Sequence, residues 1–318
     1  MVQKNSLKPK IVCIGGPTSV GKTNLAIKLA NLFDGEIISC DSIAIYKYLN
    51  IGSAKPTNQE QSLAKHYMID IKEPFDEYSV AEYRNDTTKI IKDILDRNKL
   101  PIIVGGTGLY MKGLLFPLDL GHSKKSTEIR EKYQRIVDEK GGEFLLEYLK
   151  QIDPISAEKL HAKDINRIIR ALEIFELTGK KKSDFKTELI SPYDYKLILL
   201  NDDRKQLYEK INYRTEKMFE MGLEEEVKNI VQTYNLTKNN QSMSGIGYKE
   251  FFDYFDKKIS KEELIELIKL NSRHYAKRQL TWFKAMPNVK EYNCHDVEKI
   301  IDDVERFLNK TNKLKKIY

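Results

Sequence analysis

The stretch at residues 16–23, with the sequence GPTSVGKT, constrains the fold of this chain more than any other segment. It matches the pattern GxxxxGK[ST], in which backbone N–H groups curl around a phosphate and a helix N-terminus adds about half a positive charge. The pattern is informative only between a strand and a helix. Both are expected here, because the apolar run IVCI at residues 11–14 precedes it and residues 22–33 carry apolar side chains at helical spacing. We therefore predict a phosphate-binding loop.

Eight residues make up this P-loop, namely Gly16, Pro17, Thr18, Ser19, Val20, Gly21, Lys22 and Thr23. We expect Lys22 to reach the terminal phosphate of the ligand and the Thr23 hydroxyl to bind Mg²⁺. The motif does not say which phosphate compound is bound, so ATP remains one of the open choices.

Apolar runs and helical patterns alternate along much of the chain. We expect strands at residues 36–40, 68–71, 101–104 and 195–200, and helices at residues 80–95, 204–221, 223–234, 261–283 and 296–308. Strands that alternate with helices build a parallel sheet with helices on both faces. The predicted fold class is therefore α/β, with a P-loop-type parallel sheet core flanked by helices.

The stretch from about residue 120 to residue 186 differs from the rest, because it is charged and helix-forming and contains no convincing strand. Turn signals such as Gly141-Gly142 and Asp153-Pro154 divide it, and Gly179 ends a helix that begins near Asp164. We predict a catalytic core at residues 1–118 and 187–318, which includes the C-terminal helices, and an all-helical insertion domain at residues 119–186.

The composition narrows the class of protein. Lys and Arg number 54 and Asp and Glu 47, and the resulting net charge of +7 permits a nucleic-acid partner without requiring one. Three widely spaced cysteines without a CxxC pair predict neither a disulfide framework nor a zinc site.

No run of about 18 apolar residues occurs, which excludes a transmembrane helix, and the polar N-terminus does not resemble a signal peptide. We expect a cytoplasmic, monomeric protein.

Polar residues follow three of the predicted strands. Ligands of an open α/β sheet bind at the carboxyl ends of the strands, so we expect Asp41, the GGTG sequence at residues 105–108 and the P-loop to share one crevice. Asp41 can hold Mg²⁺, act as a general base, or cap a helix together with Ser42. Thr107 can donate a hydrogen bond to a phosphate oxygen or serve as an ordinary turn residue.

Taken together, several segments resemble the tRNA dimethylallyltransferases, also called tRNA isopentenyltransferases, in their bacterial form. The matching strings run nearly from end to end of the chain: GGPTSVGKT (15–23), DSIAIYKYLNIGSAKPT (41–57), HYMID (66–70), YSVAEYR (78–84), IIVGGTGLYMKGLL (102–115), DINRIIRALEIFELTGK (164–180), YEKINYRTEKMFEMGLEEEV (208–227), GIGYKE (245–250) and RHYAKRQLTWFK (273–284). Many enzymes share a P-loop, but the combination with GSAKP, GGTGLY and YAKRQLTWF is specific.

The resemblance implies a reaction. Such enzymes transfer a dimethylallyl group from dimethylallyl diphosphate to N6 of the adenosine just 3′ of the anticodon in certain tRNAs, and they release diphosphate. The P-loop would then hold the diphosphate with Mg²⁺ in place of ATP, and its positive charge would help the leaving group depart.

The resemblance also assigns roles to single residues. Asp41 would accept the N6 proton as the amine attacks the allylic carbon. General-base catalysis of this kind typically raises the reaction rate by about 10²–10⁴-fold. Arg214 would contact the diphosphate, although taken alone it reads as an exposed helix arginine. Thr107 would lie near the reacting adenosine. We therefore predict Asp41, Thr107 and Arg214 as catalytic residues.

Contacts with the tRNA anticodon stem-loop are implied for a further set, namely Asp41, Ser42, Ile43, Ala44, Thr107, Asn166, Arg167, Ile168, Ile169, Arg170, Arg273 and Lys277. Arg167 and Arg170 lie three residues apart and thus on one helix face, where they can meet RNA phosphates or form ion pairs, as Arg170 can with Glu173. Trp282 and Phe283 are interleaved with the basic residues near the C-terminus and fit either a core or a surface facing RNA.

Ala44 departs from the family pattern, which usually has Gln at this position, three residues after the Asp. Because Gln would contact target bases, its absence predicts weaker discrimination of the adenosine or its neighbours, or compensation by another side chain.

Three alternatives remain open from the sequence. A small-molecule kinase would use ATP and close arginines of the insertion over the phosphates. An adenylate isopentenyltransferase would run the same chemistry on a free nucleotide. An RNA-binding nucleotide switch would leave Asp41 without a chemical role.

Overall fold

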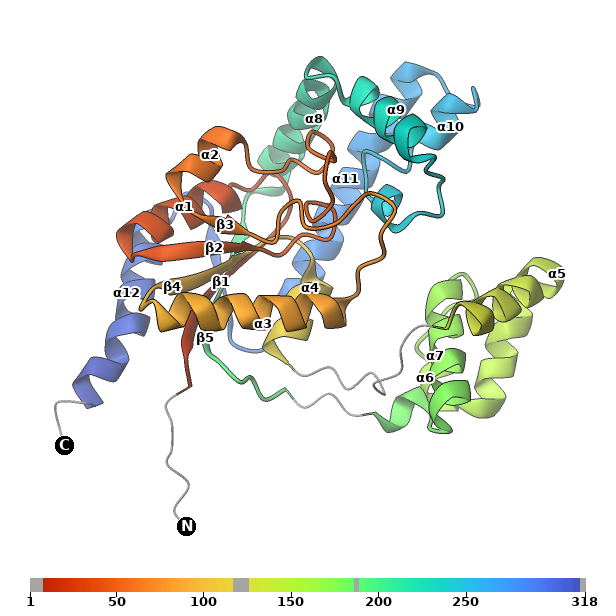
Figure 1. Ribbon diagram of the computed structural model, residues 1–318, viewed down its shortest axis with the longest axis horizontal. Coiled ribbons are helices and arrows are strands. Elements are labelled where there is room, and N and C mark those ends of the chain that lie inside the picture. The colour runs from red at the N-terminus through yellow and green to blue at the C-terminus, as the bar shows by residue number, and fades with distance from the viewer. Residues whose placement is uncertain (1–7, 117–125, 186–188, 315–318) are drawn as a thin grey trace, which may run out of the picture. The chain divides into compact units, whose positions relative to one another are not determined.

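The computed structural model describes residues 8–116, 126–185 and 189–314. The chain divides into two compact units, one of residues Met1–Leu115 with Ser191–Tyr318 and one of residues Phe116–Ile190. The insertion expected at residues 119–186 falls inside the second unit. Each unit is described by itself below (Figure 1).

The first unit is built on a six-stranded sheet, in which every described pairing is parallel. The strands, in the spatial order β3-β2-β4-β1-β5-β6, are β3 (His66–Tyr67), β2 (Gly35–Ser39), β4 (Leu100–Val104), β1 (Lys10–Gly15), β5 (Asp194–Asn201) and β6 (Val289–Asn293). The strand that precedes the P-loop therefore lies at the centre of the sheet, between β4 and β5. Its residues Ile11 to Ile14 are fully buried, as expected for a parallel strand covered on both faces.

Helices cover the sheet. The first unit contains α1 (Lys22–Leu32), α2 (Asn58–Leu63), α3 (Val80–Asp96), α4 (Gly108–Leu115), α8 (Arg204–Glu220), α9 (Leu223–Tyr234), α10 (Phe251–Phe255), α11 (Lys261–Lys284), α12 (Val297–Leu314) and the short 3-10 helix η2 (Gln241–Ser244). Apolar side chains of α1, α8 and α12 join alternate side chains of β1, β2, β4 and β5 in one buried cluster. Figure 1 shows α3 running along the opposite side of the sheet.

Capping boxes set where two of the long helices begin. The Ser79 side chain accepts a hydrogen bond from the Glu82 backbone N–H, and Glu82 reaches back to the N-cap, so α3 begins at Val80. Ser260 and Glu263 do the same for α11. Such boxes satisfy N–H groups that a helix start leaves without partners.

The second unit is all-helical within its described residues, with α5 (Thr127–Ile152), α6 (Pro154–Ala157), α7 (Ile165–Thr178) and the 3-10 helix η1 (Lys182–Asp184). Its core contains Tyr133, Leu145, Leu149, Ile168 and Leu172. The α5 segment is broken at Gly141, whose φ of 83° lies in the left-handed region that favours glycine.

At the sheet edges, one predicted strand is wrong and one strand was missed. The strand expected at residues 68–71 is instead β3, two residues long, because Met68 and Asp70 have φ angles of 63° and 55° that no strand continues through. The strand β6 was not predicted, because only Tyr292 of its five residues is buried and an edge strand of this kind carries little apolar signal. No helix in the described ranges is long and apolar enough to cross a membrane.

Candidate active site

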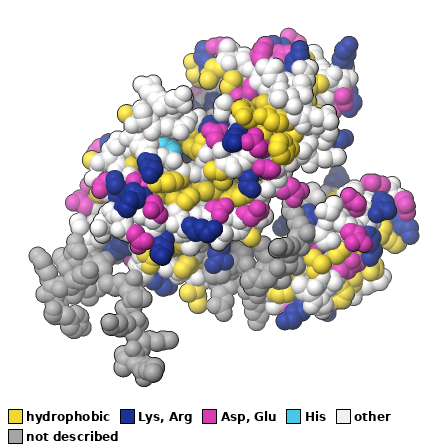
Figure 2. Space-filling model, viewed as in Figure 1, with side chains coloured by type: hydrophobic (Ala, Val, Ile, Leu, Met, Phe, Trp, Pro, Cys, Tyr) yellow, Lys and Arg dark blue, Asp and Glu magenta, His cyan; other side chains and the backbone are white. Residues whose placement is uncertain are grey.

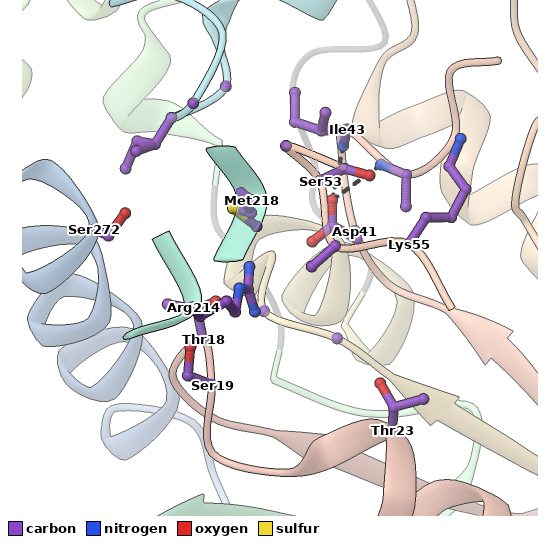
Figure 3. Close-up of a pocket in the computed structure, with 18 of the residues that line it drawn as sticks. Thr18, Ser19, Thr23, Asp41, Ile43, Ser53, Lys55, Arg214, Met218 and Ser272 are labelled. Atoms are coloured by element: carbon purple, nitrogen blue, oxygen red, sulfur yellow. Dashed lines mark hydrogen bonds between the residues drawn. The ribbon is translucent and has the colours of Figure 1, made fainter. Parts of the chain in front are cut away.

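A cavity of about 640 Å³ opens at the carboxyl ends of β1, β2 and β4, as the strand-end argument predicts. The P-loop, the loop after β2, Gly105 and Gly106 after β4, and side chains of α8 and α11 line it. Figure 3 shows Thr18 and Ser19 just below Arg214 of α8, with Thr23 at the lower right, and Asp41, Ser53 and Lys55 on the side that faces Arg214 and Met218. All its lining residues belong to the first unit.

The P-loop adopts the backbone of an anion cradle. Gly16 and Gly21 have positive φ angles of 147° and 93°, and Ser19 adopts a φ of 64°. A Cβ at Gly16 would lie 2.5 Å from the Leu200 carbonyl oxygen, so only glycine fits there. The buried Ser19 hydroxyl has no hydrogen-bond partner among the described residues. A polar atom buried in this way inside a phosphate loop fits a bound anion.

Two cations, Lys22 and Arg214, line the cavity. Burial, together with the nearby Arg214 guanidinium, lowers the pKa of Lys22 to about 7 against the opposing effect of Asp41. Burial likewise lowers the pKa of Arg214 to about 10, against the effect of Asp41. The Lys22 ammonium donates to the Pro17 carbonyl at 2.6 Å, and no described carboxylate lies within ion-pair distance of either cation. A bound polyanion would therefore supply the missing negative charge.

Gln279 of α11, which was not predicted as a site residue, holds the P-loop in place. Its side-chain oxygen accepts a hydrogen bond from the Thr18 backbone N–H at 3.0 Å, and its amide nitrogen donates to the Gly106 carbonyl at 3.0 Å. Gln279 is only 4% exposed. The YAKRQLTWF string contains this residue, but nothing in a sequence reveals which loop a helix side chain meets.

Asp41 has one of the three roles left open by the sequence, because it caps the turn that follows β2, and it also lines the cavity. One carboxylate oxygen caps the following turn by accepting from the backbone N–H groups of Ile43 (2.8 Å) and Ala44 (3.1 Å). The residue also lines the cavity, on the wall opposite Arg214 (Figure 3). Capping therefore fixes the carboxylate while its second oxygen stays available for chemistry.

Thr107 ties the ends of β2 and β4 together. Its hydroxyl accepts from the Ser42 backbone N–H at 3.0 Å, and its own N–H donates to the Cys40 carbonyl at 3.1 Å. These bonds hold Thr107 against Ser42, which lines the cavity, whereas Thr107 itself is not among the described residues that line it. Tyr275 of α11, whose pKa burial raises above its usual range, lines the same cavity.

Ala44 sits at the cavity wall with its methyl group 3% exposed. Its carbonyl accepts from the Asp70 backbone N–H at 3.3 Å. The neighbouring Ser42 and Ile43 also line the cavity. The wall therefore lacks a side-chain amide at this point.

The predicted RNA-contacting residues of α7 divide into two groups. The side chains of Ile168 and Ile169 are 0% and 4% exposed and pack in the core of the second unit, so they do not face solvent as an RNA contact requires. Arg170 forms an ion pair with Glu173 at 2.5 Å, as one alternative held. Asn166 and Arg167 are exposed and remain candidates for RNA contact.

The basic residues of α11 also lie in different surroundings. Arg273 donates to the Asn212 side chain at 2.7 Å and is half-buried, whereas Lys277 is exposed. Phe283 is fully buried, but Trp282 is 42% exposed with the Lys112 ammonium 5.9 Å from its ring. Figure 2 shows basic and acidic side chains interspersed over the visible face.

The donor set fits Mg²⁺ at the P-loop. The Thr23 hydroxyl and the Asp41 carboxylate are both oxygen donors that line the one cavity, and such ligands are those that Mg²⁺ prefers. A second cluster outside the cavity, of Asp202, Cys294 and His295, brings ligand atoms within 4.8 Å of one another. There the Lys210 ammonium already neutralises Asp202 at 2.6 Å.

Comparison with known proteins identifies the family. The sequence pattern described as IPP transferase matches residues 44–286. The chain belongs to this family. It is 47% identical over 296 residues to the tRNA dimethylallyltransferase of Bacillus cytotoxicus, with 92% of each chain covered, and 46% identical over 294 residues to that of Bacillus mycoides.

Solved structures of the family agree with the fold. The full-length tRNA isopentenylpyrophosphate transferase from Bacillus halodurans is 38% identical with a TM-score of 0.73, and the alignment covers 97% of this chain and 99% of that one. A eukaryotic dimethylallyltransferase acting on tRNA is 30% identical with a TM-score of 0.76, over 90% of this chain and 74% of that one. The predicted family, and the P-loop-type α/β fold, are confirmed.

Proposed function

We propose that this protein transfers a dimethylallyl group from dimethylallyl diphosphate to N6 of the adenosine just 3′ of the anticodon in tRNA. The product is N6-(dimethylallyl)adenosine, and diphosphate leaves. One observation carries the proposal: Lys22 of the P-loop and Arg214 of α8, which have no carboxylate within ion-pair distance in the described part of the chain, line one cavity with the Asp41 carboxylate.

The P-loop holds the leaving group. Backbone N–H groups of residues 18–23, the Lys22 ammonium and the Arg214 guanidinium bind the diphosphate oxygens, where negative charge grows as the C–O bond breaks. Mg²⁺ held by Thr23, with Asp41 nearby, would neutralise part of that charge. The anion in this loop is the diphosphate of the prenyl donor, not ATP.

The residues around Asp41, on the wall opposite Arg214, act on the acceptor adenosine. The free oxygen of Asp41 takes the N6 proton as the amine attacks the allylic carbon, and the turn that caps the other oxygen fixes the direction of the carboxylate. Thr107, whose hydroxyl accepts from the Ser42 backbone N–H, would help to position the adenine. A stacked base cannot bring N6 to a buried carbon, so the adenosine must turn out of its stack.

RNA contacts are proposed for residues whose side chains are exposed or half-buried. Asn166 and Arg167 of the insertion and Lys277 of α11 offer polar or positive groups to the RNA, and Arg273 offers one from a half-buried position. Phosphate contacts of this kind fix orientation without reading sequence. We propose that the protein acts as a monomer in the cytoplasm, where its tRNA acceptor is found.

Isotopic transfer from labelled dimethylallyl diphosphate with Mg²⁺ tests the proposal. The acceptors are an anticodon stem-loop with adenosine after the anticodon, the same stem-loop with guanosine there, AMP, and no acceptor. We expect label only in the adenosine stem-loop. Label in AMP alone would instead identify an enzyme acting on a free nucleotide. Folded protein that labels nothing yet consumes ATP would point to a kinase.

A further inference from the structure

Two sequence motifs outside the reaction chemistry, GLEEEV at residues 222–227 and GIGYKE at residues 245–250, meet at one loop of the cavity. Glu226 lies on α9, and Tyr248 follows η2. Both contact residues 50–53, which belong to the segment after β2 that begins with Asp41. We call residues 50–55 the wall loop, because all six line the cavity.

Glu226 binds the wall loop through its backbone. Its carboxylate oxygens accept hydrogen bonds from the N–H groups of Asn50 (3.0 Å), Ile51 (2.8 Å) and Gly52 (3.2 Å). Three successive N–H groups directed at one carboxylate form an anion-binding nest. The anion bound in this nest is the Glu226 carboxylate of the same chain. A charged acceptor makes these bonds stronger than those of a neutral one.

Tyr248 extends the same contact by one residue. Its hydroxyl donates to Glu226 at 2.8 Å and accepts from the Ser53 backbone N–H at 3.1 Å. The side chain is fully buried, and a Cβ at Gly52 would lie 2.6 Å from its ring, so the ring packs directly on the loop backbone. Four successive backbone N–H groups of the loop thus depend on the Glu226–Tyr248 pair.

The wall loop needs such support, because the backbone is strained at Ala54 within it and at Tyr48, two residues before it. Tyr48 and Ala54 adopt φ angles of 69° and 48°, which cost non-glycine residues free energy. The Lys55 ammonium provides a second tether by donating to the Tyr46 carbonyl and to Asp70. Figure 3 shows Ser53 and Lys55 next to Asp41, on the wall that faces Arg214 and Met218.

We propose that Glu226 and Tyr248 are positioning residues for the transfer reaction. They hold the wall loop, and through it the cavity wall beside Asp41, in the geometry in which acceptor and allylic carbon meet. The P-loop has a separate support, since Gln279 holds it from α11. Loss of the Glu226–Tyr248 contact should therefore slow turnover and leave binding of diphosphate intact. This inference rests on the proposed function.

The test uses Glu226→Gln, which keeps the size of the side chain and removes its charge, and Tyr248→Phe, which removes only the hydroxyl. Glu224→Gln is the matched control, because Glu224 lies on the same helix and accepts from a tyrosine, Tyr254, but contacts no part of the wall loop. Each full-length variant is measured for kcat and KM in the stem-loop assay, for the Kd of inorganic diphosphate, and for its thermal melt.

For Glu226→Gln we expect kcat to fall on the order of tenfold to a hundredfold, as misplacement of reacting groups by about 1 Å can cause. Tyr248→Phe should show a smaller fall in kcat. The Kd of diphosphate should stay within about twofold of wild type in both variants, and Glu224→Gln should match wild type throughout.

Two results would overturn the inference while the wild-type protein remains active. One is an unchanged kcat in Glu226→Gln. The other is a Kd of diphosphate that weakens as much as kcat falls, since that would indicate general loss of structure. A wild-type protein that transfers no label is a different outcome, because it rejects the proposed function and the inference with it.

Discussion

The Gln279 side chain accepts a hydrogen bond from the Thr18 backbone N–H at 3.0 Å and donates to the Gly106 carbonyl at 3.0 Å. One residue of the C-terminal half thus links the P-loop after β1 to the loop after β4. The two loops come from the first third of the chain, yet their spacing depends on a helix that follows the insertion.

Replacement of Gln279 tests this link. Gln279→Ala removes both hydrogen bonds and leaves two buried backbone groups without partners, so we expect it to lower the free energy of unfolding by about 1–3 kcal/mol. The Kd of diphosphate should weaken on the order of tenfold, measured by calorimetry. Thr281→Ala on the same helix is the control, because that exposed hydroxyl bonds only its own helix. Equal diphosphate binding in wild type and Gln279→Ala would contradict the link.

The low pKa of Lys22 predicts proton uptake on binding. With a pKa of about 7, Lys22 is mostly neutral at pH 8 in the free protein, and a bound diphosphate favours the charged form. Binding at pH 8 should therefore take up close to one proton more in wild type than in Lys22→Met, and this difference should shrink at pH 6. Calorimetry in buffers of different ionisation enthalpy measures it, and the variant accounts for protons exchanged by the ligand itself. Equal uptake in both proteins at pH 8 would rule out this role for Lys22.

Replacement of Ala44 by Gln should increase the discrimination between acceptor stem-loops. Because Ala44 lines the cavity next to Ile43, an amide introduced by Ala44→Gln would reach the bound bases. We expect the ratio of kcat/KM between the adenosine stem-loop and one with a changed neighbouring base to rise on the order of tenfold, since a good side-chain contact to a base is worth about 1–3 kcal/mol. Ala44→Ser, which is too short to reach the bases, serves as control. An unchanged ratio would indicate that this position does not set specificity.

Arg167 and Arg170 should differ although they share one helix face. Arg170 helps to neutralise the fully buried Glu173, whose pKa its bonds with Arg130 and Arg170 lower to about 2 against the effect of burial. Arg170→Ala should therefore lower the melting temperature, since it weakens the neutralisation of a buried carboxylate. Arg167→Ala should weaken stem-loop binding, with a smaller salt dependence and an unchanged melting temperature. The reverse pattern in melts and binding curves would refute the assignment.

Much of the fold follows from local sequence, and the exceptions have physical reasons. The buried strand β1, the P-loop and Asp41 carry strong signals, because apolar runs and strand-end residues act locally. The edge strand β6, in contrast, carries almost no local sequence signal. The strand β3 ends where Met68 adopts a positive φ angle, which a methionine usually avoids and which the sequence does not signal.

The residues that hold the loops of the site in place could not be predicted from local sequence. Gln279 and Glu226 act on backbone N–H groups more than 170 residues away in the chain, and no pattern marks such a partner. Ile168 and Ile169 show the opposite error, because a motif that resembles an RNA-contacting segment also contains the residues that build its core.

The rate of transfer in Asp41→Asn under single-turnover conditions tests the central claim most directly. The amide can still cap the turn through its oxygen, but it accepts a proton far less readily than a carboxylate. We expect the rate of transfer to the adenosine stem-loop to fall by about 10²–10⁴-fold while the Kd of diphosphate changes little. A rate close to that of wild type would contradict the assignment of Asp41 as the base opposite the P-loop.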